Sequence, residues 1–298
     1  KSEYSPRLKK LGIQFSTGLG SSSLTYMART WHPDIVHAHS STQFSLAHRL
    51  ASRLRIPYVL TCHGLGFSHP KYKQDLEAAA HVIAIGPNVA SEIKSICKNL
   101  TIIPNGINTE HYVPPQGGMV RNQVVYIGRI DCSKIPGINQ LALVLNRYFN
   151  RNLTVIGDWN PEVPGTIFQP WKTDLLPTLQ QAGIVAACGR TAREALACGN
   201  AVLLMQKYYD GLVSPALTSR PDFDFSGNQG RFSFYRLRKD LKKLLSSPNA
   251  LQKLQTWSRH YAVQHLSSAS MATQIAQIYA AVRDQPTPRP KYLERLTW

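Results

Sequence analysis

The chain has 298 residues, of which 43% are apolar, and 34 Lys and Arg oppose 17 Asp and Glu, a formal net charge of +17. This size and composition predict a soluble globular protein of about two domains. No apolar run approaches the roughly 20 residues of a membrane-spanning helix, and the first residues are polar and basic rather than signal-like, so we expect a cytoplasmic protein. The five cysteines are an odd number without a C-x-x-C pair, which argues against a disulfide framework or a zinc site.

The net charge favours anionic partners, which include nucleic acid, an acidic membrane surface and phosphorylated small molecules. The densest basic stretch, 231–245, has the spacing of an amphipathic helix with Phe234, Leu237, Leu241 and Leu244 facing inward. A solvated outer face is the simplest interpretation of its charges. The sequence contains no basic stripe interleaved with aromatic residues and no recognition motif, so nothing specific favours nucleic acid.

In chain order, short apolar runs alternate with helical patterns, which is typical of parallel sheets covered by helices. The strand candidates are 34–39, 58–63, 81–86 and 100–104, then 123–128, 153–157, 183–188 and 201–205. Helical patterns include 43–55, 138–149, 174–183 and 268–283. The predicted fold class is α/β, with two Rossmann-like domains and a ligand cleft between the carboxyl ends of their sheets.

The stretch 113–122, with two Pro and two Gly, predicts the domain boundary. We expect an N-terminal domain at 1–115, a C-terminal domain at 116–283 and a tail at 284–298 that is disordered or crosses back to the first domain. The first apolar strand pattern, 11–15, has no strand and Gly-rich turn before it, so we expect the N-terminal domain to be incomplete at its start.

The segment "YIGRIDCSK" places Gly128 and Arg129 at the end of a predicted strand and Lys134 five residues after the arginine. Strand ends face the cleft, where an arginine fork and a lysine charge suit a diphosphate. The alternative is a pair of surface cations in a basic protein.

The segment "ACGRTAREALACG" predicts a strand, a tight turn and a helix. Gly189 would let backbone amides of Arg190 and Thr191 approach an anion at the helix start. Thr191 and Glu194 also have the T-x-x-E spacing of a capping box, and on spacing alone this cap is the better interpretation of Glu194.

His39 and His63 end consecutive predicted strands, so we expect both to face the cleft. No carboxylate or cysteine stands at ligand spacing from them, so we expect no metal site. His63 is the stronger functional candidate because Gly64 and Gly66 leave room for a ligand.

Together these segments resemble GT-B-fold glycosyltransferases of glycosyltransferase family 4. The matching segments are "PDIVHAH", "TCHGLG", "VIAIGPNVASEI", "TIIPNGINTEHY", "VVYIGRIDCSK", "LTVIGDW" and "EALACGNAVLL". The resemblance implies two facing Rossmann-like domains, with the acceptor bound mainly by the first and the nucleotide sugar by the second. It implies a retaining, metal-independent transfer without a cofactor, from a nucleotide-diphosphate sugar, most often a UDP-sugar, to a glycan, lipid-linked or small-molecule acceptor. The net charge of +17 by itself suits an anionic donor, or an acceptor at the inner membrane surface on which the protein docks peripherally.

The resemblance also assigns roles to particular residues. Arg129 and Lys134 hold the donor diphosphate beside Gly128. The turn at 189–191 meets the distal phosphate, Glu194 accepts hydrogen bonds from the ribose, and His63 lies near the transferred sugar.

Three departures from the family pattern keep other functions open. The family's first glutamate, eight positions before Glu194, corresponds to Ala186, the turn after Lys134 is two residues longer, and the N-terminal Gly-rich loop is missing. A non-catalytic relative that binds a nucleotide sugar or a partner glycosyltransferase is therefore the alternative, and a UDP-sugar epimerase of the same fold is a minor one.

Overall fold

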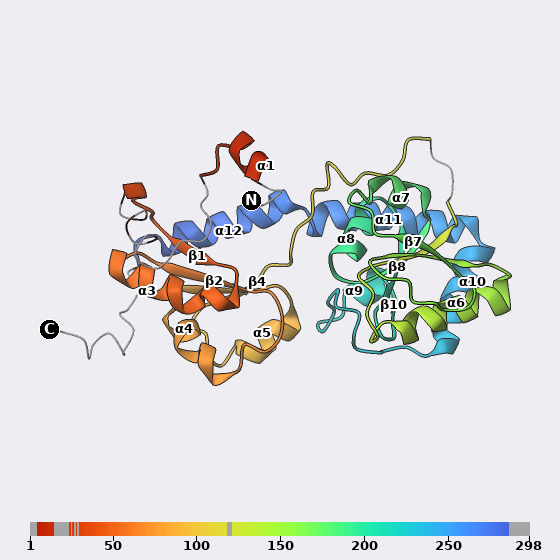
Figure 1. Ribbon diagram of the computed structural model, residues 1–298, viewed down its shortest axis with the longest axis horizontal. Helices are drawn as coiled ribbons and strands as arrows, with labels where there is room; N and C mark the ends of the chain where they lie inside the picture. The colour runs from red at the N-terminus through yellow and green to blue at the C-terminus, as the bar shows by residue number, and fades with distance from the viewer. Residues whose placement is uncertain are drawn as a thin grey trace. The chain divides into compact units, whose positions relative to one another are not determined.

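The computed structural model describes residues 5–14, 24, 26, 28, 30–117 and 121–285. Its internal contacts divide the chain into two compact α/β units (Figure 1). The first unit consists of Lys1–Ala84, Glu92–Thr101 and Ile278–Trp298, and the second of Ile85–Ser91 and Ile102–Gln277.

The first unit contains a four-stranded sheet in the order β1-β2-β3-β4, in which β2 pairs in parallel with both β1 and β3. The strands are β1 (Val36–Ala38), β2 (Tyr58–Cys62), β3 (His81–Ala84) and β4 (Leu100–Ile102). The described helices are α1 (Ser5–Lys10), α3 (Phe44–Leu54) and α4 (Lys73–Ala78), with short 3-10 helices at Ser41–Gln43 and Pro70–Tyr72. Helix α5 (Pro87–Ile93) begins in the second unit and ends in the first. Strand β2 is central and fully buried. It therefore holds the residue that follows it, His63, at the carboxyl-end edge of the sheet.

The second unit contains a six-stranded sheet in the order β10-β9-β8-β5-β6-β7, parallel except for β10. Its strands are β5 (Val124–Ile127), β6 (Leu153–Gly157), β7 (Thr166–Pro170), β8 (Ile184–Ala187), β9 (Ala201–Met205) and β10 (Tyr209–Leu212). Its helices are α6 (Ile135–Phe149), α7 (Leu176–Gln181), α8 (Gly189–Ala197), α9 (Pro215–Thr218), α10 (Phe234–Ser246), α11 (Pro248–His265) and α12 (Ser268–Val282).

Two hydrophobic cores lie on the two faces of this sheet. Val124 and Tyr126 belong to one core, whereas Val125 and Ile127 belong to the other, as the two-residue period of a strand requires. Helices α6 and α10 complete the first core, and α7 and α8 complete the second. All eight strands that the sequence predicted are present, β6 and β9 with the predicted bounds and the others slightly shorter. The strands buried on both faces, such as β2, β5 and β9, read as continuous apolar runs.

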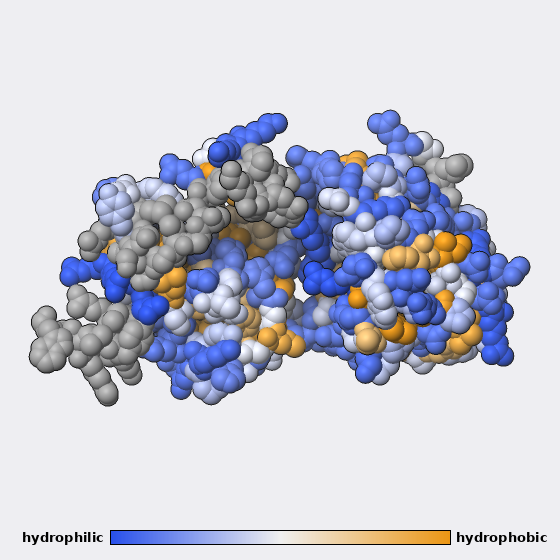
Figure 2. Space-filling view, in the orientation of Figure 1, coloured by the Kyte–Doolittle hydropathy of each residue, from blue (hydrophilic) through white to orange (hydrophobic). Residues whose placement is uncertain are grey.

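The basic stretch predicted as an amphipathic helix is α10. Leu237, Leu241 and Leu244 are buried and Phe234 packs at the edge of the same core, as predicted. On the face shown in Figure 2, hydrophilic residues predominate and apolar residues form small separate patches. Among the residues that the structure describes, no helix is long and apolar enough to cross a membrane.

The division between the units differs from the boundary expected at residue 116. Contacts place Ile102 and the residues after it in the second unit, where Ile107 is buried and its backbone pairs with α12 and the residues before it. The return to the first unit is made by the last turns of α12, from which the Tyr279 hydroxyl reaches the Nδ1 atom of His37 at 2.5 Å.

Two further expectations concern the ends of the chain. Residues 11–14 form a turn and coil rather than a strand, and residue 15 lies outside the described residues. Residues 286–298 of the expected tail also lie outside them.

Gly183, just before β8, has no room for a side chain. A Cβ there would lie 1.7 Å from the backbone oxygen of Arg121. We expect Gly183→Ala to lower the free energy of unfolding by roughly 3 kcal/mol, because backbone atoms cannot yield as a flexible side chain can. Urea unfolding followed by circular dichroism measures this. The matched control is Gly64→Ala, whose Cβ would meet nothing within 4 Å; an equal loss in both variants would contradict the prediction.

Candidate functional site

The predicted donor-site residues of the second unit follow two neighbouring parallel strands. In the register of β5 and β8, Tyr126 lies opposite Ala186. Gly128 and Arg129, which follow β5, and Gly189, which follows β8, therefore emerge at the same sheet edge. The fold thus brings together the two segments that the sequence analysis singled out separately.

Arg129 and Lys134 differ in how free they are to meet a ligand. Arg129 is exposed and makes no hydrogen bond or ion pair with another described residue. Lys134, the N-cap residue of α6, is largely covered, and its Nζ atom donates to Asp131 Oδ2 at 2.5 Å. The amide of Gly128 donates to Ile156 O at 3.1 Å. Gly128 therefore has no free amide for a ligand, and its contribution is the room left by the missing side chain.

The Asp131 carboxylate that holds Lys134 was not singled out from the sequence. Hydrogen bonds from Lys134 and then from Ser133 lower the pKa of Asp131 to about 2. The folded pKa lies below the unfolded value, so this contribution to stability is present above pH 4 and is lost as pH falls through about 2. A ligand phosphate must compete with Asp131 for the ammonium group.

We expect Lys134→Met to raise the pKa of Asp131 towards the ordinary value near 3.9, because the lysine bond is the largest cause of the depression. Carbon-13 NMR titration of the Asp131 carboxyl measures it. Lys172→Met, which removes a lysine that contacts Thr178 instead, should leave the titration unchanged. A wild-type pKa near 3.9 would show that the pair is absent in solution.

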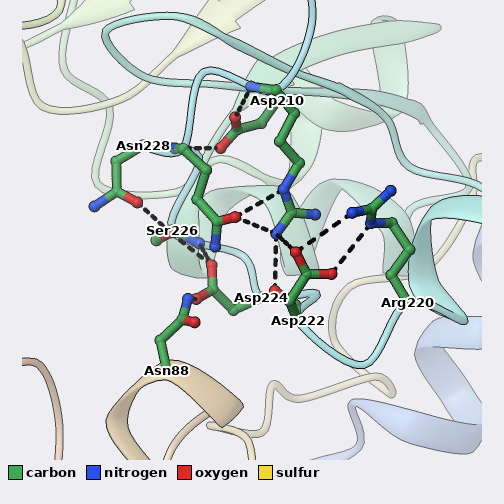
Figure 3. Close-up of polar contacts among 9 residues, drawn as sticks. Asn88, Asp210, Arg220, Asp222, Asp224, Ser226 and Asn228 are labelled. Atoms are coloured by element: carbon green, nitrogen blue, oxygen red, sulfur yellow. Dashed lines mark hydrogen bonds and ion pairs between the residues drawn. The ribbon is translucent and has the colours of Figure 1, made fainter. Parts of the chain in front are cut away.

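The amino end of α8 is covered in part by the loop after β10. Gly189 has a φ of +58°, the left-handed region that glycine tolerates, and its amide donates to Phe225 O at 2.6 Å. Figure 3 shows how the loop is held: Asp222 pairs with Arg220 and Arg231, and Asp210 accepts backbone amides from the same loop. Of the predicted phosphate turn, the amide of Gly189 is therefore already engaged.

The capping-box interpretation of Glu194 is wrong. The N-cap of α8 is Cys188, so Thr191 lies inside the first turn instead of at the cap. Glu194 is 3% exposed and accepts a hydrogen bond from Arg190 Nε at 2.7 Å. Burial, followed by the charge and a hydrogen bond of Glu194, raises the pKa of Tyr112 to about 12. Glu194 is therefore paired with Arg190 of its own first helical turn rather than with the helix amides, and it lies beside Tyr112, which no sequence pattern indicated.

The position assigned by spacing to the family's first glutamate cannot present a side chain to a ligand. Ala186 lies in β8, is fully buried and belongs to the core beneath α6 and α10. A carboxylate at this position would enter that core. Counting back eight positions from Glu194 therefore locates no site residue here.

The first unit brings three histidines together at the ends of β1 and β2. The Nδ1 atom of His39 lies 3.2 Å from Nε2 of His63, and the His37 ring lies 4.1 Å from the His39 ring. His39 and His63 lie together, as their places at consecutive strand ends predicted. That they face a ligand cleft stays a prediction, and His37 was not singled out. Burial, with the charges of the other two rings, lowers the pKa of His37 to about 3, and partial burial lowers the pKa of His39 and His63.

These lowered pKa values mean that the three rings are neutral at pH 7. A neutral imidazole both donates and accepts a hydrogen bond, so His63 can offer a hydroxyl-rich ligand either role. No group of three or more His, Cys, Asp or Glu in the described part of the chain has the arrangement of a metal site.

Known proteins resemble the chain in family and in fold. Residues 5–111 match Glycosyltransferase Family 4, and no curated protein sequence matches the chain. A glycosyltransferase from Rickettsia africae superposes with a TM-score of 0.70 at 15% identity, covering 96% of this chain and 89% of that one. HepE from Anabaena, solved with UDP and glucose, gives 0.69 at 14% identity, covering 94% and 89%. Sucrose-phosphate synthase from Thermosynechococcus elongatus gives 0.62 at 17% identity, covering 94% and 79%.

At these identities the structural likeness establishes the fold, and the family match adds the sequence relationship of the first part of the chain. The chain therefore has the GT-B fold of two Rossmann-like domains and resembles the glycosyltransferases of family 4.

Proposed function

We propose that the protein is a glycosyltransferase that moves a sugar from a nucleotide-diphosphate donor, UDP in the first instance, to a glycan, lipid-linked or small-molecule acceptor. The observation that carries this proposal is the unpaired Arg129 beside Lys134, at the same sheet edge as the amino end of α8 and Glu194. UDP and UDP-glucose complexes of the structurally similar HepE support the choice of donor.

In this proposal, the bond between the sugar C1 and the donor diphosphate breaks and a bond from C1 to an acceptor oxygen forms. The acceptor proton passes to the departing diphosphate. Negative charge grows on the diphosphate as it leaves, and the Arg129 fork and the Lys134 ammonium stabilise it where it develops. Because two cations neutralise the diphosphate, the proposed transfer needs no metal ion. Retention of the anomeric configuration is a separate part of the proposal and comes from the family resemblance.

The remaining residues position the two substrates. The amides of Arg190 and Thr191 face the distal phosphate at the amino end of α8, and Glu194 accepts the ribose hydroxyls in exchange for part of its Arg190 contact. From the resemblance we carry over the role of His63, which is to contact the transferred sugar. The exposed basic residues of α10 suit peripheral docking at the cytoplasmic face of a membrane, which is the setting we propose for a lipid-linked acceptor.

A calorimetric and thermal-shift screen of UDP, GDP, ADP and their common sugars tests the donor site. We expect saturable binding of UDP that Glu194→Ala weakens at least tenfold, since the variant loses charge-assisted hydrogen bonds to the ribose. Glu77→Ala, which removes an exposed carboxylate paired with Lys73, is the matched control and should bind UDP as the wild type does.

Binding without hydrolysis or transfer of the sugar would favour the non-catalytic relative, for which the engaged Gly189 amide and the Asp131–Lys134 pair are the specific observations. Absence of binding by every nucleotide would contradict the transferase and the nucleotide-sugar-binding relative, and would leave the relative that binds a partner glycosyltransferase.

A further inference from the structure

A cavity of about 450 Å³ lies within the second unit, apart from the proposed donor residues. All of its lining residues belong to that unit, and none of them is Arg129, Lys134, Gly189, Arg190, Thr191 or Glu194. The residues that matter for its chemistry are Arg193, Phe223, Asp224, Phe225, Tyr261 and His265. The volume is within the range of small-molecule sites.

Arg193 lines this cavity as a buried cation without a hydrogen-bond partner in the described part of the chain. It is 7% exposed, and its guanidinium makes no hydrogen bond or ion pair with another described residue. Its Nε atom is buried and unpartnered. Burial lowers its pKa to about 10, so the group is still charged at neutral pH. The Nε–H of this cation is a buried donor without an acceptor, which is costly to desolvate. The two terminal nitrogens make no hydrogen bond with a described residue, so an occupant of the cavity can supply acceptors for them.

The walls beside Arg193 are aromatic. Its guanidinium lies over the Phe225 ring, 4.7 Å from the centroid, and Phe225 packs edge-on against Phe223. Tyr261 lines the same cavity. This ring contact orients the planar fork and stabilises its charge in part, but it satisfies no N–H donor. The site therefore holds a planar guanidinium next to apolar ring surface.

The net charge of the walls decides which anion fits. Asp224 also lines the cavity, and Figure 3 shows its carboxylate held by Asn88 and Ser226. Asp224 forms no ion pair with Arg193, but after burial, which lowers the pKa of Arg193, the Asp224 charge is the largest influence and raises it. The aspartate therefore offsets part of the guanidinium charge and also opposes an incoming anion. One arginine beside one aspartate tolerates a single negative charge better than the two of a phosphate group.

We propose that this cavity binds a small organic monocarboxylate, whose carboxylate is held by the Arg193 fork and whose apolar body lies against Phe225 and Tyr261. The site is separate from the donor site, although both depend on α8: Glu194 faces the proposed ribose, and Arg193, one residue earlier, lines the cavity. A carboxylate bound there is placed to regulate the neighbouring donor site through this helix.

Calorimetry of the full chain with 3-phenylpropionate, 3-phenylpropan-1-ol and phenyl phosphate tests the proposal. We expect the carboxylate to bind best, with an affinity that saturating UDP does not abolish. Arg193→Met should weaken it about 10- to 100-fold, which is the loss expected for charge-assisted hydrogen bonds. Arg238→Met, which removes an exposed arginine stacked on Tyr148, should bind the carboxylate as the wild type does. Neither result depends on glycosyltransferase activity.

Three outcomes would overturn the proposal: no binding of the carboxylate by the wild type, equal binding of the alcohol, or tighter binding of the phosphate. If Arg193→Met does not fold, the affinity of Arg193→Lys for the carboxylate is measured instead. We expect weaker binding than in the wild type, because lysine keeps the charge without the bidentate fork. Carboxylate affinity equal to that of the wild type in Arg193→Lys would also contradict the assignment.

Discussion

Arg129→Ala should reduce sugar release from the UDP-sugar donor by about 10²- to 10³-fold, the usual effect of removing one group that stabilises developing negative charge. Arg129 is the proposed clamp residue that the described part of the chain leaves unpaired, so its loss removes ligand contacts without breaking a structural one. The thermal midpoint of the ligand-free protein should therefore not change. The measurement is the initial rate of UDP formation, with or without an acceptor.

Arg129→Lys is the matched variant, because it keeps the charge and loses the planar fork. It should retain more of the rate than Arg129→Ala. An unchanged rate in Arg129→Ala would remove the diphosphate role from Arg129 and with it the proposed mechanism. Unchanged UDP binding with a lost rate would instead show that Arg129 acts only on the departing charge.

Ala186→Glu should destabilise the second unit by more than about 4 kcal/mol, which is a large part of the 5–15 kcal/mol that holds a domain together. Ala186 is fully buried in β8 between β5 and β9, so the carboxyl group would be desolvated without a partner. Urea unfolding followed by circular dichroism measures the effect.

Ala272→Glu introduces the same residue at an exposed position of α12 and should change the unfolding free energy by less than about 0.5 kcal/mol. If Ala186→Glu folded normally and bound UDP-sugar more tightly, Ala186 would be the position of the missing glutamate after all. We expect the opposite, because the strand register directs this side chain into the core.

The sequence alone determined the class of fold and most of its elements. Strands buried on both faces, such as β5 and β8, need runs of apolar residues, and short runs that alternate with longer helical patterns favour strands over buried helices. The sequence also determined which residues follow those strands, which is why Arg129, Lys134 and Glu194 could be named at all. Composition and pattern likewise predicted α10 with its leucines inward.

The tertiary structure adds how these side chains are partnered. Arg190 and Asp131 are local partners, four and three residues from Glu194 and Lys134, whereas Tyr112 and Phe225 reach α8 from segments distant in sequence or from a loop without a pattern. Glu194 pairs with Arg190 and lies beside Tyr112, although its spacing from Thr191 predicted a cap. The boundary near residue 102 depends on Ile107 packing beside α12, more than 150 residues away in the sequence. No sequence pattern distinguished Arg193 from the other cations of this basic chain. The structure buries it against Phe225 of a long loop, and Tyr261 of the later helix α11 lines the same cavity. Local patterns encode secondary structure because neighbouring residues determine it, whereas desolvation and pairing are set by long-range packing.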